Sequence, residues 1–463
     1  MGFLEEEGLI LKGIFNRFKK RNFNGTGGQT VKNSTYQLAT IIVAKVTALF
    51  FTIIIARMLL PELFGLYSLA ISTIFLVSSF SDLGLGSALI TFVSKSLGKN
   101  NFTKAKAYFK QLAKFKIYLL IISSIILISL AYFLSEVYYK KPIFFALLAG
   151  GLYIPIFGFS VFLENLFKSS NNFKYPLIKE IIVQVSRFVL VPFGIFIFLK
   201  FTLSNKTIVA GIVLILVLCY FFGLLFLGLS AKKKLPFLNY KKSPLSKKEK
   251  KELWKFIFPL TATALSGIFF GYIDIIMLGY FVSEEFIGYY SAAFSLISSA
   301  SVIIGFMGMA MFPLFSRLKG KDLERIFLNT TRITLLISLT VSAITFIFTT
   351  FIVKLVYGAE YSNTIPLVKI FSIFLLFYPL LAIYEYYLIS QEKTKNLAIW
   401  LIIATILNVL LNYLFITFGL KYGMLVGVIG SCIATIISRF IYLLGLMWER
   451  RKLNKKINST IIS

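Results

Sequence analysis

The sequence predicts an all-α polytopic membrane protein, with twelve transmembrane helices in two parallel six-helix repeats. Composition is the first reason: of 463 residues, 58% are hydrophobic and only 15% are charged, and the mean hydropathy is +0.84. The second is that twelve apolar runs are long enough to cross a hydrocarbon core of about 30 Å, which takes roughly 20 residues. The third is an internal repeat of about half the chain.

The repeat is clearest where the first apolar run ends. At a shift of 223 residues five identities fall within nine positions, pairing Glu62, Gly65, Tyr67, Ser68 and Ala70 with Glu285, Gly288, Tyr290, Ser291 and Ala293. A shift of 222 aligns a second stretch, pairing Ala88, Ser94, Gly98 and Lys99 with Ala310, Ser316, Gly320 and Lys321. Chance similarity between apolar helices is the alternative. Glycines and charges at loop positions argue against it, and a duplicated unit is predicted.

The expected spans follow in chain order. They are 33–59, 63–81, 116–134, 143–163, 175–199 and 208–229, then 253–281, 286–313, 326–352, 365–390, 397–418 and 424–447. This divides the chain into an N-terminal segment (1–32), an N-lobe (33–230), a basic linker (231–252), a C-lobe (253–448) and a basic tail (449–463). Because six is even, both lobes enter the membrane from the same side and are parallel repeats.

The basic residues predict the orientation. Of 49 Lys and Arg residues, 38 lie in the termini and loops on one side of the predicted membrane, and seven lie on the other. We therefore expect both termini to be cytosolic and the protein to lie in the cytoplasmic membrane. The net charge of +30 is then a topology signal and an attraction to anionic lipid, and nucleic-acid binding is not expected.

Several function classes lack the residues they need. There is no His, and the two cysteines lie in apolar runs, so neither a metal site nor a cofactor is indicated. No G-x-x-x-x-G-K-[ST] loop occurs, the loops opposite the termini are short, and no acidic pair suits a membrane glycosyltransferase. A major-facilitator sugar transporter is disfavoured because residues 95–116 lack the D-R-x-G-R-R-like signature. An enzyme is not expected.

Five ionisable residues lie deep in the expected spans: Lys45, Arg187, Asp274, Lys369 and Arg439. Each costs on the order of 3 kcal/mol on insertion scales, so such residues usually face a cavity or a partner. Four are cationic, which favours an anionic passenger such as a phosphate or pyrophosphate. Asp274 is predicted to be the only deep carboxylate, and Lys369 is the weakest candidate.

Two faces carry the predicted substrate-binding residues. Lys45 shares a helix face with Ala48, Thr52 and Ala56, a small and partly polar stripe fit to line water or substrate, and Lys45 and Thr52 are the candidates. The alternative for Lys45 is a side chain that extends to the interface.

A second stripe lies on the fifth expected span. Glu180, Gln184 and Arg187 share one face, and Pro192 follows closely enough to loosen the backbone, which suits an anion site. The alternative is a Glu180–Arg187 linkage that only fixes helix packing. Arg439 is a further substrate-binding candidate, with extension to the interface left open.

The carboxylates are candidates for ion coupling. Asp274 can pair with a cationic group or bind a coupling cation, and Glu180 is the second candidate. Na⁺ and H⁺ both remain possible. The nearby Gly267-x-x-x-Gly271 is predicted to be a close-packing motif.

A family resemblance rests on one region. Ala56-Arg57, then Pro61-Glu62-x-Phe64-Gly65-x-Tyr67, then Asp82-Leu83-Gly84-Leu85-Gly86 resembles the Wzx-type polysaccharide flippases of the multidrug/oligosaccharidyl-lipid/polysaccharide (MOP) exporter superfamily. The sequence departs from that pattern at Leu60, where the family usually has Gly.

The resemblance implies a MATE-like fold that moves a polyprenyl-(pyro)phosphate-linked oligosaccharide across the bilayer by alternating access, driven by Na⁺ or H⁺. The alternative is a MATE-like cation-coupled exporter of small molecules. Gly65 and Gly288 open equivalent helices of the two lobes, so we expect them, with Pro192, to be hinge or packing positions. The cargo residues are expected elsewhere.

Overall fold

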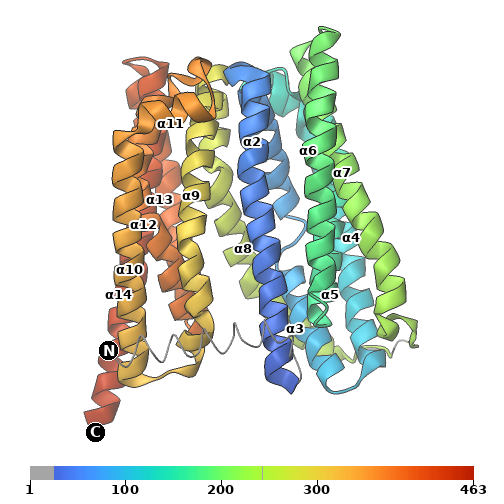
Figure 1. Ribbon diagram of the computed structural model, residues 1–463. Coiled ribbons are helices and arrows are strands. Elements are labelled where there is room, and N and C mark those ends of the chain that lie inside the picture. Colours follow the sequence, from blue (N-terminus) through green and yellow to red (C-terminus); the bar gives the residue numbers. More distant parts are fainter. Residues whose placement is uncertain (1–24, 242, 463) are drawn as a thin grey trace.

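The computed structural model describes residues 25–241 and 243–462, and these residues are helical or lie in short connections between helices (Figure 1). The expected N-terminal segment 1–32 lies mostly outside the described residues. Among the described residues, ten helices are long and apolar enough to cross a membrane. The predicted all-α polytopic class is confirmed.

The helices fall into two groups, one that ends at Lys234 and one that follows it. The first half contains α2 (Gly25–Ser79), α3 (Leu85–Gly98), α4 (Phe102–Tyr132), the π-helix η1 (Phe133–Tyr139), α5 (Phe144–Ser169), α6 (Lys174–Lys200) and α7 (Asn205–Lys234). The second contains η2 (Pro236–Asn239), α8 (Lys247–Phe281), α9 (Glu284–Arg317), α10 (Gly320–Ile347), α11 (Thr349–Val356), η3 (Ala359–Tyr361), α12 (Thr364–Ser390), α13 (Thr394–Leu420) and α14 (Met424–Ile462). α2 contains the first two expected spans, and α8 is the seventh.

Two faces of the bundle are used below. The basic face is the one on which the linker between α7 and α8 runs and α14 ends, at the bottom of Figure 1. The opposite face carries the turn within α2 and the short helix α11, at the top of Figure 1. The lysine-rich loops lie on the basic face.

The turn within α2 is strained. Leu60 has φ 60° and ψ 171°, a left-handed region that favours glycine, and Pro61 follows it inside the helix. Leu60 is also the residue at which the sequence departs from the family pattern, which has Gly there. The chain therefore makes this turn with a side chain that disfavours it.

The apolar cores show how the lobes meet. One core is continuous between the lobes and includes Phe51 and Phe64 of α2 together with Tyr289 and Tyr361 of the C-terminal half. A second core is confined to the N-terminal half and the start of α8, and it includes Leu85, Leu112, Phe162, Leu166, Leu227, Leu253 and Ile257. The lobes share a core near the opposite face, whereas the N-lobe has its own core near the basic face.

α8 begins on the N-lobe. Ser246 and Glu249 form a capping box at its first turn, and Lys104 of α4 pairs with Glu249. The Lys104 ammonium and the Ser246 N–H hold the pKa of the Glu249 carboxyl below its ordinary value, so the pair is present at neutral pH. Further along, the Thr261 hydroxyl donates to the Leu83 carbonyl at 3.0 Å.

Candidate functional site

Gly65 and Gly288, the clearest pair in the repeat, lie against each other's helices at the opposite face. A Cβ placed on Gly65 would lie 1.8 Å from the Glu284 carbonyl oxygen, and one on Gly288 would lie 2.0 Å from the Pro61 carbonyl oxygen. Only glycine allows this approach. The duplicated turn therefore closes the two lobes on each other with a reciprocal contact.

Side chains around the glycines reinforce this closure. Arg57 donates through Nε to the Val356 carbonyl at 2.8 Å and also bonds the Leu355 carbonyl, so it caps the end of α11. The Tyr361 hydroxyl donates to the Ala56 carbonyl at 2.8 Å. Together with the glycine pair, these bonds join the N-lobe to the C-lobe at the opposite face.

A cavity of about 370 Å³ lies nearer the basic face. Its wall comes mainly from the C-lobe, with one residue of α2 (Ile41), and the C-lobe residues include Phe270, Gly305, Tyr378, Glu385, Arg439 and Tyr442. Arg439 is the fifteenth residue after the start of α14, about 22 Å along the helix from the opposite face. The contacts that close the opposite face therefore lie at the far ends of the helices that form the cavity.

Arg439 lines the cavity, and one of its hydrogen-bond donors has no partner. Its guanidinium lies over the Phe270 ring at 3.6 Å and donates to the Phe270 carbonyl at 2.6 Å. Its Nε is buried without a hydrogen-bond partner, and no ion pair of Arg439 occurs among the described residues. A buried cationic donor without a partner is costly, so an anion in the cavity would satisfy it.

Glu385 corrects the prediction that Asp274 is the only deep carboxylate. Glu385 of α12 lines the same cavity and accepts a hydrogen bond from the Tyr442 hydroxyl at 3.0 Å. It lies five residues before the end of α12, which in sequence indicates an interface position. α12 is instead among the most buried of the spans, so Glu385 faces the cavity.

Lys45 lies on a different side of α2 from the N-lobe contacts. It is exposed and lies one turn from Ile41, which lines the cavity. Phe51, on another side of α2, instead contacts the Arg187 guanidinium of α6. Thr52 is half-buried, and Ala56 at the top of the same stripe lies under Tyr361. The Lys45 stripe therefore faces the C-lobe and is closed at its upper end.

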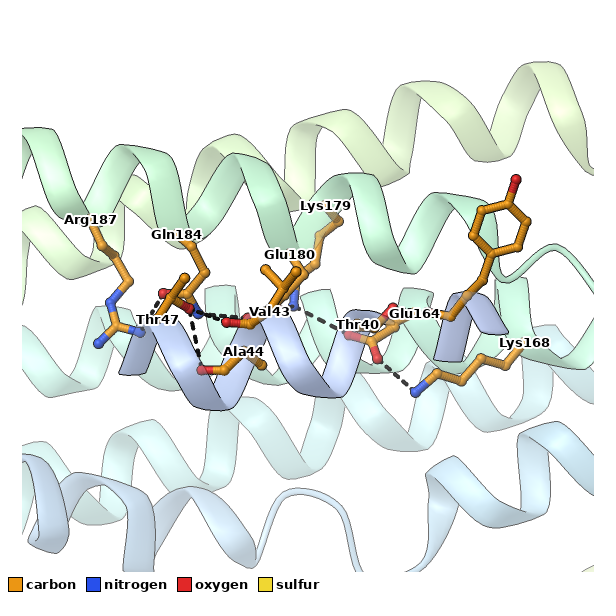
Figure 2. Close-up of polar contacts among 11 residues, drawn as sticks. Thr40, Val43, Ala44, Thr47, Glu164, Lys168, Lys179, Glu180, Gln184 and Arg187 are labelled. Carbon is orange, nitrogen blue, oxygen red and sulfur yellow. Dashed lines mark hydrogen bonds and ion pairs between the residues drawn. The ribbon is translucent and has the colours of Figure 1, made fainter. Parts of the chain in front are cut away.

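Arg187 belongs to a polar network inside the N-lobe (Figure 2). Its Nη1 donates to the Gln184 Oε1 at 3.3 Å, and the Gln184 amide donates to the Glu180 Oε1 at 2.6 Å. The guanidinium lies 3.9 Å over the Phe51 ring, and Nε has no partner. Hydrogen bonds thus join the predicted stripe of Glu180, Gln184 and Arg187 along α6, and the arginine connects it to α2.

The network continues toward the basic face through buried ion pairs. Lys179 is 3% exposed and pairs with Glu164 at 3.2 Å and Glu180 at 3.3 Å (Figure 2). Glu164 also pairs with Lys168 at 2.7 Å. Because Glu180 is already neutralised by Lys179, it is poorly placed to bind a second cation. α6 runs without interruption through Pro192.

Asp274 is the centre of a cluster in the C-lobe. The carboxylate is 3% exposed and accepts hydrogen bonds from Asn412 at 2.6 Å, Thr435 at 2.8 Å and Tyr290 at 2.9 Å. All three donors are neutral, and no basic residue pairs with Asp274 among the described residues. A buried carboxylate without a basic partner is costly, and a cation bound there would offset that cost.

Polar atoms beside the carboxylate extend this cluster. The Ser431 hydroxyl donates to the Asn412 Oδ1 at 2.6 Å, and the buried Asn408 Oδ1 has no hydrogen-bond partner. These residues are not among those predicted from the sequence. The spacing of Asn408 and Asn412, four residues apart in an apolar run, is the signal that could have found them.

The predicted residues therefore fall in three places. Arg439 lines the cavity, with Lys45 on the face of α2 nearby. Arg187 lies in the N-lobe network on another side of α2, and Asp274 lies in the C-lobe cluster. Lys369 is exposed, with its ammonium 6.0 Å from the Phe346 ring. The structure does not bring Lys45, Arg187 and Asp274 into one cavity.

The second part of the family motif is also structural. Asp82 pairs with Lys116 at 3.3 Å, and Lys116, 1% exposed, also donates to the Ser81 carbonyl at 2.9 Å. Gly84 has φ 85°, and a Cβ there would lie 2.8 Å from the Leu260 Cβ of α8. The motif therefore holds the turn before α3 against α8.

Comparison with known proteins agrees with this architecture. The model of the polysaccharide biosynthesis protein family matches residues 30–319, and the MatE model matches residues 259–414. No curated protein sequence matches the chain.

Three solved structures have the same fold. The inward-facing conformation of a multidrug resistance MATE family transporter of the MOP superfamily has a TM-score of 0.69 at 14% identity, covering 92% of this chain and 99% of that one. The lipid II flippase MurJ in an inward closed conformation has 0.65 at 16%, covering 89% and 87%. The outward-facing conformation of a multidrug resistance MATE family transporter has 0.56 at 14%, covering 92% and 96%.

Among the described residues, the fold and the apolar spans are those of a polytopic membrane protein that is similar in fold to solved transporters of the MOP superfamily. Because the first family model matches more than half of its residues, the chain belongs to the polysaccharide biosynthesis protein family.

Proposed function

We propose that this transporter is a flippase that moves a polyprenyl-(pyro)phosphate-linked oligosaccharide across the cytoplasmic membrane by alternating access. The basic face is cytosolic, and the cavity receives the phosphate-bearing head of the cargo from that side. The observation that carries this proposal is Arg439, a cationic wall residue whose Nε has no partner. The polyprenyl tail remains in the lipid.

Several features support an inward-facing state for the described conformation. The lobes are joined by the Gly65–Gly288 contact at the opposite face, and the cavity lies on the basic side of that contact. The fold is also closer to the inward-facing MATE structure than to the outward-facing one, with TM-scores of 0.69 and 0.56. Release on the opposite side requires the glycine contact to open.

The cavity wall carries one basic and one acidic residue, Arg439 and Glu385, and the two interact differently with an anionic cargo. A phosphate or pyrophosphate brings negative charge to Arg439 and, on the facing side of α2, to Lys45, with Thr52 further along the stripe. Glu385 lies on the same wall and repels an anion when it is ionised. A protonated Glu385 removes that repulsion and can donate a hydrogen bond to the cargo.

The coupling ion binds at Asp274. The cluster offers carboxylate, amide and hydroxyl oxygens, the ligand type that hard cations prefer, and protonation of Asp274 is the H⁺ form of the same mechanism. Between the two predicted carboxylates, the structure favours Asp274 because Glu180 is paired with Lys179. Gln184 and Arg187 then stabilise the N-lobe rather than the cargo.

A reconstituted flipping assay tests the proposal. The full chain is placed in vesicles with a fluorescent undecaprenyl-diphosphate-linked disaccharide, and dithionite destroys fluorescence only in the outer leaflet. We expect the protein to make the inner-leaflet probe accessible within the assay and R439Q to prevent this. A wild-type protein that leaves half of the probe protected, as empty vesicles do, would contradict the proposal.

A cation-coupled exporter of small molecules is the second candidate, and it is supported by the MatE match over residues 259–414. Efflux of ethidium from cells that express the protein separates the two functions. We expect no efflux, because the cavity presents Arg439 to a cationic dye.

A further inference from the structure

A second groove lies at the basic face, away from the transport cavity. Its volume is about 690 Å³, and α4, the linker and the first turn of α8 form its walls. Three lysines line it, Lys110, Lys114 and Lys250, together with Gln111, Ile117, Tyr118, Ser243, Pro244 and Leu245. All three lysines are exposed, and none of them takes part in an ion pair within the described part of the chain.

The lysines continue into a lipid-facing stripe on α4. Lys110, Lys114, Ile117, Ile121 and Ile128 follow one another at intervals of four, three, four and seven residues, so they share one helix face. The three isoleucines are 45%, 50% and 46% exposed. The α4 face is therefore cationic at the basic face and apolar toward the membrane centre.

The length of the stripe fits one leaflet. Lys114 and Ile128 are 14 residues apart, about 21 Å along α4, whereas one leaflet contributes about 15 Å of hydrocarbon. An acyl chain that begins at the lysines can thus follow isoleucines for its whole length. A free phosphate ion would bind at the lysines alone and would not contact the isoleucines.

Contacts on both sides hold the groove in place. Lys106 bonds the Tyr240 carbonyl, Phe102 packs on the Tyr240 ring with centroids 5.1 Å apart, and Lys104 pairs with Glu249. These bonds fix the linker and the start of α8 against α4, and so they fix Lys250 beside Lys114. The Lys114 ammonium also lies 5.7 Å from the Tyr118 ring.

We propose that this groove binds the phosphate headgroup of an anionic phospholipid, with one acyl chain lying along Ile117 and Ile121. Three ammonium groups from two helices attract the phosphate, and the site lies where headgroups of the basic-face leaflet lie. The bound lipid joins α4 to the linker and thereby holds the start of α8 on the N-lobe. This proposal is independent of the cargo of the transporter.

The C-lobe lacks the same combination. At the 222-residue shift of the repeat, Lys114 corresponds to Leu336 (114 + 222 = 336), and Leu336 is 64% exposed. No linker crosses the corresponding helix, α10, because the linker joins α7 to α8. The groove is therefore a property of the N-lobe and its linker, and the C-lobe supplies a matched control.

Trp254 offers a local reporter. It lies one turn beyond Lys250, and its ring centroid is 4.5 Å from that of Phe115, the neighbour of Lys114. The full chain is reconstituted in phosphatidylcholine vesicles with a small share of phosphatidylglycerol brominated on its acyl chains, or the same share of brominated phosphatidylcholine. Bromine quenches tryptophan in contact, and the part of the quenching lost in W254F is the signal from the groove.

We expect the wild-type protein to prefer phosphatidylglycerol by at least about tenfold, since each lysine near the surface contributes roughly fivefold. The variant K110Q/K114Q/K250Q should lose that preference, and K319Q/K321Q/K395Q, with three exposed lysines changed on the basic face of the C-lobe, should keep it. Equal groove signals from the two lipids in the protein with native lysines would overturn the proposal. An unchanged preference in the groove variant would also overturn it.

Discussion

The two lobes share a fold but differ in the charge that they bury. At the 223-residue shift, Asp274 corresponds to Phe51 (274 − 223 = 51). Asp274 is a buried carboxyl group held by neutral donors, whereas Phe51 lies under the Arg187 guanidinium at 3.9 Å. At corresponding positions, the C-lobe therefore has a carboxyl group without a basic partner, and the N-lobe has an aromatic ring covered by an arginine.

The symmetric positions behave differently from the asymmetric ones. Gly65 and Gly288 correspond in the repeat and meet in one reciprocal contact that closes the opposite face. Arg439, Asp274 and Glu385 lie in the C-lobe. The duplication thus provides the closure, and the chemistry proposed for transport lies where the duplication has been lost.

The largest expected effect separates the two stacked arginines. R439Q removes the wall cation and should lower the flipping rate of the fluorescent undecaprenyl-diphosphate-linked disaccharide by about 100-fold, the upper range for a hydrogen bond to a charged group. R187Q should lower it by less than about threefold, because Arg187 serves the N-lobe network. An equal loss in both variants would show that the cargo site extends to the Arg187 network of the N-lobe.

The next comparison sets Asp274 against Glu180. D274N keeps the size of the side chain but cannot carry a net charge, so flipping should continue slowly and lose about tenfold acceleration by an imposed Na⁺ or H⁺ gradient. E180Q should keep the acceleration, because Glu180 is paired with Lys179. The flipping rate of each variant is measured in vesicles with a Na⁺ gradient and, separately, with an H⁺ gradient. A D274N protein that still responds to a gradient contradicts the assignment.

Much of the architecture could be predicted from the sequence. The apolar runs predict a polytopic helical protein, and the recurring motif singles out Gly65 and Gly288, which the structure brings against each other's helices. The burial of Asp274 also follows from its depth in an apolar run. Each of these features depends on one helix at a time.

The site itself needed tertiary information. Lys45 and Phe51 both lie on the first span, and only helix packing shows that Phe51 meets Arg187 while Lys45 does not. Glu385 is not among the predicted residues, because a position five residues from the end of α12 indicates an interface in sequence, although α12 is buried along most of its length. Which face of a span meets which lobe cannot be read from periodicity alone.

A smaller effect is expected for the closure. G65A or G288A places a Cβ against a carbonyl oxygen of the other lobe, so the closed opposite face should lose about tenfold or more in population. The measurement is the rate at which an impermeant maleimide labels T52C from that face, with Cys219 and Cys432 changed to Ala. G228A is the control, since a Cβ there meets nothing within 4 Å. Unchanged labelling in both closure variants contradicts the role of the glycines.

The smallest effect concerns Leu60. L60G relieves a left-handed backbone conformation and should stabilise the protein by about 1 kcal/mol, visible as a higher midpoint of thermal unfolding in detergent. L63G, in the helical part of α2 that follows the turn, should instead destabilise by about 1 kcal/mol. A lower midpoint for L60G would show that its side chain contributes more than its strain costs.

Protection of the cavity by cargo tests the central claim most directly. Ile41 is the α2 residue on the cavity wall, so I41C, in a chain whose two native cysteines are Ala, reports access to the cavity. K321C, exposed on the basic face outside the cavity, is the control. We predict that an impermeant maleimide labels I41C from the basic face and that undecaprenyl-diphosphate-linked disaccharide slows this labelling without slowing that of K321C. Labelling of I41C that the disaccharide leaves unchanged would contradict the account.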